Sequence, residues 1–396
     1  MATQVSSPKD QTKDRQTLPT AECWEWSIRP LILWIRILGV DLPDEDYRHH
    51  RWWMYVYGGV CFSSHAISQC VILHFVLYEW KQVNNQDSGE FIYGTVTATW
   101  NWIVDFMNYA IYGVGIHFML LTLIRLRWNR LKKTFQQFQI IFTEENYVRI
   151  RQISSFSVIY AILLILGLAV VNLIQQARQG ASPRRIFITF MSTLSVIYPA
   201  TALVAYTIHC YASSLAFELI QKQIELFQIE LANDRDLSLF LQTVKRKYIA
   251  VCESVDAINH CFGWMLLLST SFVFVANINS SFYLFSIEIN INDFAFLSFS
   301  LIHATQLFFS ADRIRCKAKD FLQELLRLTC DEKFKEFQLK MKFVFLDMVR
   351  SIPQISASGY FNISKRLFPQ LIGTTLTYFF ILCQFQASEK NCNLTK

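Results

Sequence analysis

The chain has 396 residues, of which 53% are hydrophobic, 15% aromatic and only 17% charged. This composition excludes an ordinary soluble protein, and the apolar residues gather in runs about as long as a helix that crosses ~30 Å of hydrocarbon. The net charge is +6, but Lys and Arg lie beside these runs and form no single patch interleaved with aromatic residues, so nucleic acid is excluded as a partner. The sequence therefore predicts an all-α membrane protein with several spans.

Sequence signatures of catalysis and metal binding are missing. The ten cysteines are scattered, with no C-x-x-C pair and no Cys/His cluster at ligand spacing, so we expect neither a disulfide framework nor a metal site. The chain has no Gly-rich phosphate loop, no H-E-x-x-H and no G-x-S-x-G, and Asp105 is an isolated acid within its span. We expect no enzyme activity and no cofactor.

The polar start of the chain, Met1 to Glu22, lacks the apolar core of a signal peptide, so we expect insertion through an internal span. Ile28–Val40 is apolar but is too short to cross and is broken by Pro30, which predicts an interfacial or re-entrant helix within an N-terminal segment, 1–52. Hydropathy predicts seven spans, at residues 53–79, 100–124, 153–175, 186–212, 262–286, 294–311 and 367–385.

The distribution of basic residues predicts the orientation. The segments that follow the first, third, fifth and seventh predicted spans contain only six of the 37 Lys and Arg residues: Lys81, Arg178, Arg184, Arg185, Lys390 and Lys396. Because basic residues are retained on the cytoplasmic side, the N-terminus is predicted inside and the C-terminal tail, 386–396, outside. The sequons at Asn279 and Asn393 fall on the predicted outer side and are expected to carry glycans.

The two longest inner segments, 213–261 and 312–366, are predicted to be helical. Apolar residues recur at three- and four-residue spacing in both, at Phe217, Ile220, Ile224, Phe227 and Leu231 and at Phe334, Phe337, Met341, Val344 and Met348. This pattern predicts helices that extend the neighbouring spans into a cytoplasmic bundle. Helices lying flat on the membrane surface remain the alternative.

The last hydrophobic element is predicted to be broken. Ile352-Pro353 interrupts the helical pattern, and Pro369 falls in the first turn of the final span, where a missing N–H is tolerated. A broken helix within a membrane occurs where it is buried in protein or lines a water-filled path.

One face of the final span is partly polar. Thr374, Thr377, Phe380 or Ile381, and Gln384 are three or four residues apart and share a face. Such a stripe serves either helix–helix packing by small polar residues or a water-filled path with its constriction at Gln384 and Phe385.

The end of the chain resembles a known family. Thr377-Tyr378, five apolar residues and then Gln384-Phe385 match every position of the C-terminal signature of the insect gustatory receptor family. The entry segment, Ile28–Gly39 followed by Leu42-Pro43, is similar to that of the same family. Two positions depart from it: Ser364 stands where relatives carry an acidic residue, and Phe379 stands where sugar-sensing members are often acidic, which points away from a sugar receptor.

The resemblance implies a ligand-gated cation channel in the plasma membrane of sensory neurons, opened by a small-molecule tastant and built as a homotetramer or heterotetramer. Four copies of the span 367–385 would surround the pore, since one helix cannot enclose a path for ions. Gln384 and Phe385 would form its narrowest ring, and Thr377, Tyr378 and Ile381 would complete the gate.

In this family the ligand pocket is expected among the outer halves of the second to sixth spans. The residues there with suitable chemistry are Trp102, Asp105, Tyr109, Tyr112, Tyr198, Asn277, Tyr283 and His303. Each of them is equally consistent with an ordinary core residue. His303 is expected to be one, because no partner for it is evident.

Other classes remain open. A G-protein-coupled receptor has the opposite orientation and an N-P-x-x-Y motif that this chain lacks. A secondary transporter predicts paired broken helices, whereas the sequence shows one clear break. A relative that senses heat or internal nutrients, or that does not conduct at all, has the same sequence features.

Overall fold

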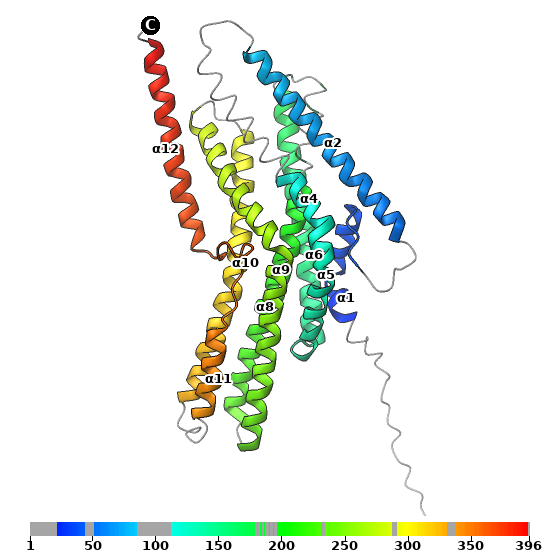
Figure 1. Ribbon diagram of the computed structural model, residues 1–396, viewed down its shortest axis with the longest axis vertical. Coiled ribbons are helices and arrows are strands. Elements are labelled where there is room, and N and C mark those ends of the chain that lie inside the picture. The colour runs from blue at the N-terminus through cyan, green and yellow to red at the C-terminus, as the bar shows by residue number, and fades with distance from the viewer. Residues whose placement is uncertain are drawn as a thin grey trace, which may run out of the picture.

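Helices make up nearly all of the structure. The computed structural model describes residues 22–43, 51–84, 112–178, 196–230, 234–286, 291–330 and 338–394, with a few single positions between 180 and 193. The helices are α1 (Glu22–Ile37), α2 (Arg51–Asn84), α4 (Gly115–Met119), α5 (Arg125–Gln136), α6 (Glu144–Arg178), α8 (Ile197–Glu230), α9 (Asp234–Ser286), α10 (Ile291–Cys330), α11 (Gln338–Arg350) and α12 (Leu367–Leu394). A π-helical turn, Leu120–Ile124, joins α4 to α5, and a 3₁₀ turn, Gln137–Ile140, follows α5. Figure 1 shows an elongated bundle.

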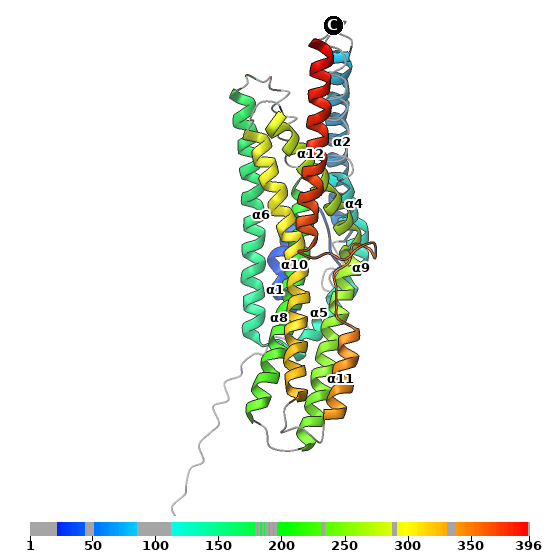
Figure 2. The same cartoon turned by 90° about the vertical axis from the view of Figure 1, so that its left-hand side faces the viewer.

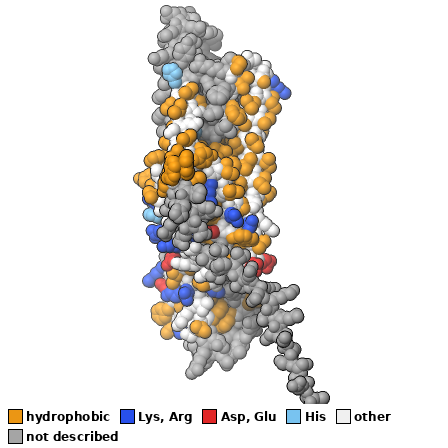
Figure 3. All heavy atoms as spheres, turned by 90° about the vertical axis from the view of Figure 1, so that its right-hand side faces the viewer, with side chains coloured by type: hydrophobic (Ala, Val, Ile, Leu, Met, Phe, Trp, Pro, Cys, Tyr) orange, Lys and Arg blue, Asp and Glu red, His pale blue; other side chains and the backbone are white. Residues whose placement is uncertain are grey.

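The helices have the length and composition expected of a membrane protein. Within the described residues, five stretches are long and apolar enough to cross a bilayer, namely Trp52–His74, Glu144–Arg178, Ile197–Phe227, Leu237–Ser281 and Phe294–Cys330, and Leu367–Ile381 is a shorter apolar stretch. On the face in Figure 3, hydrophobic side chains dominate the upper part, and most visible charged side chains lie in the lower half. The predicted class, an all-α membrane protein, is confirmed. Only the part of the predicted span 100–124 that begins at Tyr112 lies within the described residues.

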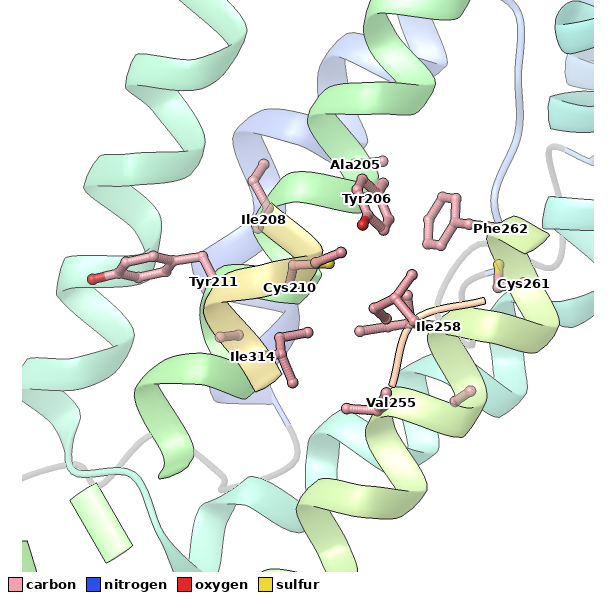
Figure 4. Close-up of a cluster of buried hydrophobic side chains, with 14 of the residues drawn as sticks. Ala205, Tyr206, Ile208, Cys210, Tyr211, Val255, Ile258, Cys261, Phe262 and Ile314 are labelled. Atoms are coloured by element: carbon pink, nitrogen blue, oxygen red, sulfur yellow. The ribbon is translucent and has the colours of Figure 1, made fainter. Parts of the chain in front are cut away.

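Helix α8 is the centre of the bundle and α6 is at its edge. The most apolar stretch of α8 is 83% buried in the protein, whereas that of α6 is 28% buried. A helix that is apolar on all sides needs apolar surroundings on all sides. Protein supplies them for α8, and the exposed apolar surface of α6 suits contact with lipid. Figure 4 shows the packing around α8, where Tyr206 and Cys210 face Ile258 and Phe262 of α9 and Ile314 of α10 lies beside them.

The lower bundle comprises α8, α9, α10 and α11 (Figures 1 and 2). Five residues of the apolar stripes predicted from the sequence are buried in its core: Phe217, Ile220 and Ile224 on α8 and Met341 and Met348 on α11. Phe227 and Val344 are partly buried, and Leu231, Phe334 and Phe337 lie outside the described residues. These segments therefore pack on one another as a helical bundle and do not lie as isolated amphipathic helices on a surface.

Helix α1 packs against protein along one face. Trp24, Ile28, Leu31 and Ile35 recur at helical spacing and are buried against α6 and α5, and Trp24 stacks on Phe135 with ring centroids 4.5 Å apart. The helix ends where the N–H of Val40 bonds the carbonyl of Ile35 at 3.1 Å. Between them Gly39 has φ +84°, a conformation that glycine adopts without a Cβ clash.

Replacing Phe217 with alanine tests whether the lower bundle is a packed core. Because Phe217 is fully buried, Phe217→Ala should cost about 3–5 kcal/mol of unfolding free energy, seen as a lower melting temperature of the purified protein in detergent. The control is Leu226→Ala on the same helix, where the side chain is 58% exposed and the cost should stay below about 1 kcal/mol. Equal melting temperatures for the two variants would contradict the packed bundle.

Candidate functional site

Helix α12 stands largely free of the rest of the protomer (Figure 1). Of its side chains that the structure describes, only Leu371 and Thr375 are buried, and Tyr378, although 48% exposed, meets Phe274 of α9 edge to face at 5.9 Å. Gln384 is exposed, and Phe385 lies in the helix with a side chain outside the description. One narrow edge of α12 therefore contacts α9 and α10, and most of the surface of its described side chains has no protein neighbour within one chain.

The two threonines predicted on the polar face of α12 make local hydrogen bonds. Thr374 donates from Oγ1 to the carbonyl of Gln370 at 2.8 Å, and Thr377 donates to the carbonyl of Gly373 at 3.0 Å. Their hydroxyl hydrogens are thus satisfied within the helix, and each oxygen keeps acceptor capacity on the exposed face.

A short non-helical segment, residues 351–366, joins α11 to α12 and is called the elbow below. It folds back on itself: the N–H of Ala357 bonds the carbonyl of Phe361 at 2.9 Å, and the N–H of Ile363 bonds that of Ile355 at 2.8 Å. Ile355, Ala357 and Ile363 are buried. The break predicted at Ile352-Pro353 is present and is ordered by hydrogen bonds and burial.

An ion pair ties the end of the elbow to α10. Lys365 Nζ lies 3.2 Å from an Asp312 carboxylate oxygen, and the Asp312 side chain is 11% exposed against 55% for Lys365. The hydrogen bond to this carboxylate raises the pKa of the Lys365 ammonium above its usual value. The chain enters α12 two residues later, at Leu367.

An aromatic cluster lies where α9 and α10 meet the start of the described part of the second predicted span. Tyr112 Oη and His303 Nε2 are 2.8 Å apart and share a hydrogen bond. The ring of Tyr112 also stacks on Phe272 of α9, with centroids 3.9 Å apart and planes 5° from parallel. Phe299 completes the contact with His303 at 6.0 Å.

A narrow cavity adjoins this cluster between α6, α8 and α10. Its lining includes Tyr160, Leu203, Phe299, His303 and Gln306, and its volume is about 10 Å³, enough for a single water molecule. Ligand pockets for small organic molecules hold at least ~300 Å³. In this conformation the cavity is therefore closed to such ligands.

A second cluster joins α2, α4 and α8. His65 and His117 share a hydrogen bond between their Nδ1 atoms, which are 3.0 Å apart. The ring of Tyr198 stacks on His117 at 3.5 Å and on His65 at 4.9 Å. The outer Nε2 atom of each histidine is buried and has no hydrogen-bond partner in the described part of the protein.

Comparison with known proteins assigns the chain to a family. The family model described as 7tm Chemosensory receptor matches residues 28–389, nearly the whole chain. The chain belongs to this chemosensory receptor family. A search of curated proteins found no match.

Solved chemosensory receptors have the same fold as this one. The insect olfactory receptor OR5 from Machilis hrabei aligns with a TM-score of 0.61 and 12% identity, covering 92% of this chain and 99% of OR5. The OR5 structure in complex with eugenol aligns with a TM-score of 0.54 and 13% identity, covering 93% of this chain and 100% of OR5. The family and the fold are those of receptors and not of enzymes.

The structure of this chemosensory receptor unites some of the residues predicted for a ligand pocket and separates others. Tyr112 and His303 are hydrogen-bonded partners, so His303 is buried as predicted but has the partner that the sequence did not reveal. Tyr198 belongs to the histidine cluster, and Asn277 bonds its own helix, from Nδ2 to the carbonyl of Val273 at 2.8 Å.

The remaining predicted residues are placed only in part. Trp102, Asp105 and Tyr109 lie outside the described residues, and Tyr283 and Asn393 lie in α9 and α12 with side chains that are not described. Asn279 is a half-buried residue of α9 whose Oδ1 is buried without a partner in the described part of the chain. Glycosylation at Asn279 and Asn393 stays a prediction.

Sequence reasoning missed Phe272, His65 and His117. The two histidines carried a usable signal, because ionisable residues within apolar spans are rare and face the protein interior. Phe272 carried none, since it is one of 34 phenylalanines in an aromatic-rich chain.

Tyr112→Phe tests the central hydrogen bond of the aromatic cluster. The change leaves a buried histidine nitrogen without its partner, so it should cost about 1–3 kcal/mol of unfolding free energy, measured by thermal melting. In a cycle with His303→Leu, the coupling energy should be about 1 kcal/mol. Tyr198→Phe serves as the control, because its hydroxyl makes no hydrogen bond within the described residues, and additive effects of Tyr112→Phe and His303→Leu would contradict the pairing.

Proposed function

We propose that the chain is a gustatory receptor: a ligand-gated, non-selective cation channel in the plasma membrane of sensory neurons, opened by a small-molecule tastant. The observation that carries this proposal is the last helix. It bears Thr377-Tyr378 and Gln384-Phe385 at the spacing of the gustatory receptor signature, and within one chain most of its described surface has no protein neighbour.

Assembly of several protomers around α12 would place its exposed polar groups in contact with water. The amide of Gln384 and the acceptor oxygen of Thr377 are poorly solvated by lipid, and one helix cannot enclose water. Closed cyclic symmetry with four copies gives both an aqueous path and a dry outer surface. Gln384 would meet the ion in the open state, and the ring of Phe385 together with Ile381 would exclude water in the closed state.

A second surface supports oligomerisation. Leu339, Phe343 and Leu346 recur at helical spacing on α11 and are exposed, while the opposite face of this helix is buried in the lower bundle. The lower bundle is proposed to lie in the cytoplasm, following the distribution of basic residues along the sequence. Because lipid does not cover an apolar stripe there, a neighbouring protomer is its natural cover. A homotetramer and a heterotetramer with related receptors meet this requirement equally.

The aromatic cluster and the adjoining cavity are the proposed ligand site. Tyr112, Phe272, Phe299 and His303 offer aromatic faces with two hydrogen-bonding groups, which suits a small, mostly apolar molecule with one polar group. The cavity must widen to admit it, so binding would favour a conformation in which α6, α8 and α10 are further apart.

One residue of the C-terminal motif bears on the taste modality. Phe379 directly after the Thr-Tyr pair points away from sugars. The experiment below has separate outcomes for a receptor that responds to heat or to an internal nutrient and for a family member that does not conduct. The motif at 377–385 favours a gustatory receptor over an olfactory one.

The experiment is a recording of cation currents from cells that express the chain, during application of a panel of small molecules. We expect a ligand-evoked current, and Gln384→Ala combined with Phe385→Ala should change relative cation permeability at least twofold, because both residues would line the narrowest ring. Gln370→Ala, an exposed amide at the opposite end of α12, is the control and should leave selectivity unchanged. A current with unaltered amplitude, rectification and selectivity in the double variant rules out this pore.

A further inference from the structure

Helix α9 contacts both the aromatic cluster and the elbow. It is 53 residues long, and Phe272 in its upper part stacks on Tyr112. Further down, Asn259 and Gly263 lie one turn apart on one face, and that face meets the elbow. Tyr248 extends the contact three turns below by donating from Oη to the carbonyl of Met348, at 2.9 Å, near the end of α11.

Asn259 binds the elbow backbone with both ends of its carboxamide. Its Nδ2 donates to the carbonyl of Gln354 at 2.8 Å, and its Oδ1 accepts from the N–H of Ser356 at 2.9 Å. A carboxamide offers one acceptor and one donor group in a fixed plane. This side chain therefore pairs with two backbone groups of the elbow, as the backbone of a neighbouring strand would. Alanine here would leave a backbone donor and a backbone acceptor without partners.

Gly263 provides the space into which the elbow fits. A Cβ at this position would lie 3.0 Å from both the backbone N and the Oγ of Ser358, and 3.2 Å from its Cα. Backbone atoms of the elbow thus rest directly on the backbone of α9. Trp264, the next residue, meets Tyr360 of the elbow edge to face at 6.2 Å.

We propose that Asn259 and Gly263 are positioning residues of the gate, which fix the elbow to α9 so that α9 and the start of α12 move together. The proposal rests on the proposed channel function and deepens it. A shift of α9 caused by a ligand at Phe272 would be transmitted through the two hydrogen bonds of Asn259 to the elbow. The elbow would then shift α12 relative to α10. The ion pair between Lys365 of the elbow and Asp312 of α10 lies at the point where this movement would occur.

The two hydrogen bonds from Asn259 to the elbow are called the clamp below. Hydrogen exchange tests the clamp without any ligand or current. In purified full-length protein in lipid nanodiscs, Asn259→Ala should speed exchange of the elbow amides, Ala357 and Ile363 among them, at least tenfold. Asn362→Ala is the matched control: Asn362 donates to Oε1 of Gln354 at 2.7 Å within the elbow, so its loss spares the bonds to α9 and should change exchange less than threefold. Should Asn259→Ala fail to fold, Asn259→Asp keeps the acceptor for Ser356 and should give an intermediate increase. Equal exchange in wild type and the Asn259 variants overturns the clamp.

Single-channel recording tests the positioning role. Asn259→Ala and Gly263→Ala should each change the open probability without added ligand at least fivefold, while the unitary conductance, which reports the intact pore, stays unchanged. Gly167→Ala on α6 is the control, because a Cβ there meets nothing within 4 Å. If the wild type conducts and both variants keep its open probability, the positioning role is wrong. If the wild type carries no current under any stimulus, the proposed channel function fails together with the gating role, and the exchange result alone decides whether the clamp exists.

Discussion

The structure depends on how its one long non-helical segment among the described residues satisfies its backbone. Away from water, each unpaired N–H or C=O carries a free-energy cost, and helices avoid it by bonding internally. Residues 351–366 leave the helix and need other partners. They find them in a short backbone pairing of their own and in the carboxamide of Asn259. The chain can thus leave α11 in the lower bundle and begin α12 in a different direction, while the backbone between the two helices stays hydrogen-bonded.

The placement of the other helices follows from the distribution of apolar surface. Helix α8 is enclosed by protein, and α6 exposes Phe156, Leu163 and Val170, which suits a helix against lipid. Helix α9 is long enough, at about 1.5 Å per residue, to extend through both the upper part and the lower bundle (Figure 1). It can therefore connect an aromatic cluster in one with an elbow at the boundary of the other.

Features with a short-range signal were predictable from the sequence. The three- and four-residue spacing of Phe217, Ile220 and Ile224 predicted the buried face of α8, and Ile352-Pro353 predicted the end of α11, because both depend on neighbouring residues. The C-terminal motif predicted the family. Pairings between distant positions were not predictable: Asn259 meets Gln354 across 95 residues of sequence, and Tyr112 meets His303 across 191. No periodicity selects one asparagine or one histidine for such a contact, which arises from the packing of whole helices.

The central claim is that α12 lines a path shared by four protomers while its elbow stays fixed to α9. An electron cryomicroscopy structure of the purified protein in lipid nanodiscs tests this most directly. The account predicts a fourfold assembly with Gln384 of each chain facing the axis, exposed apolar residues of α11 covered by a neighbour, and Asn259 within hydrogen-bond distance of Gln354 and Ser356. A single protomer whose α12 faces lipid on all sides, or an assembly in which the elbow has left α9, would contradict it.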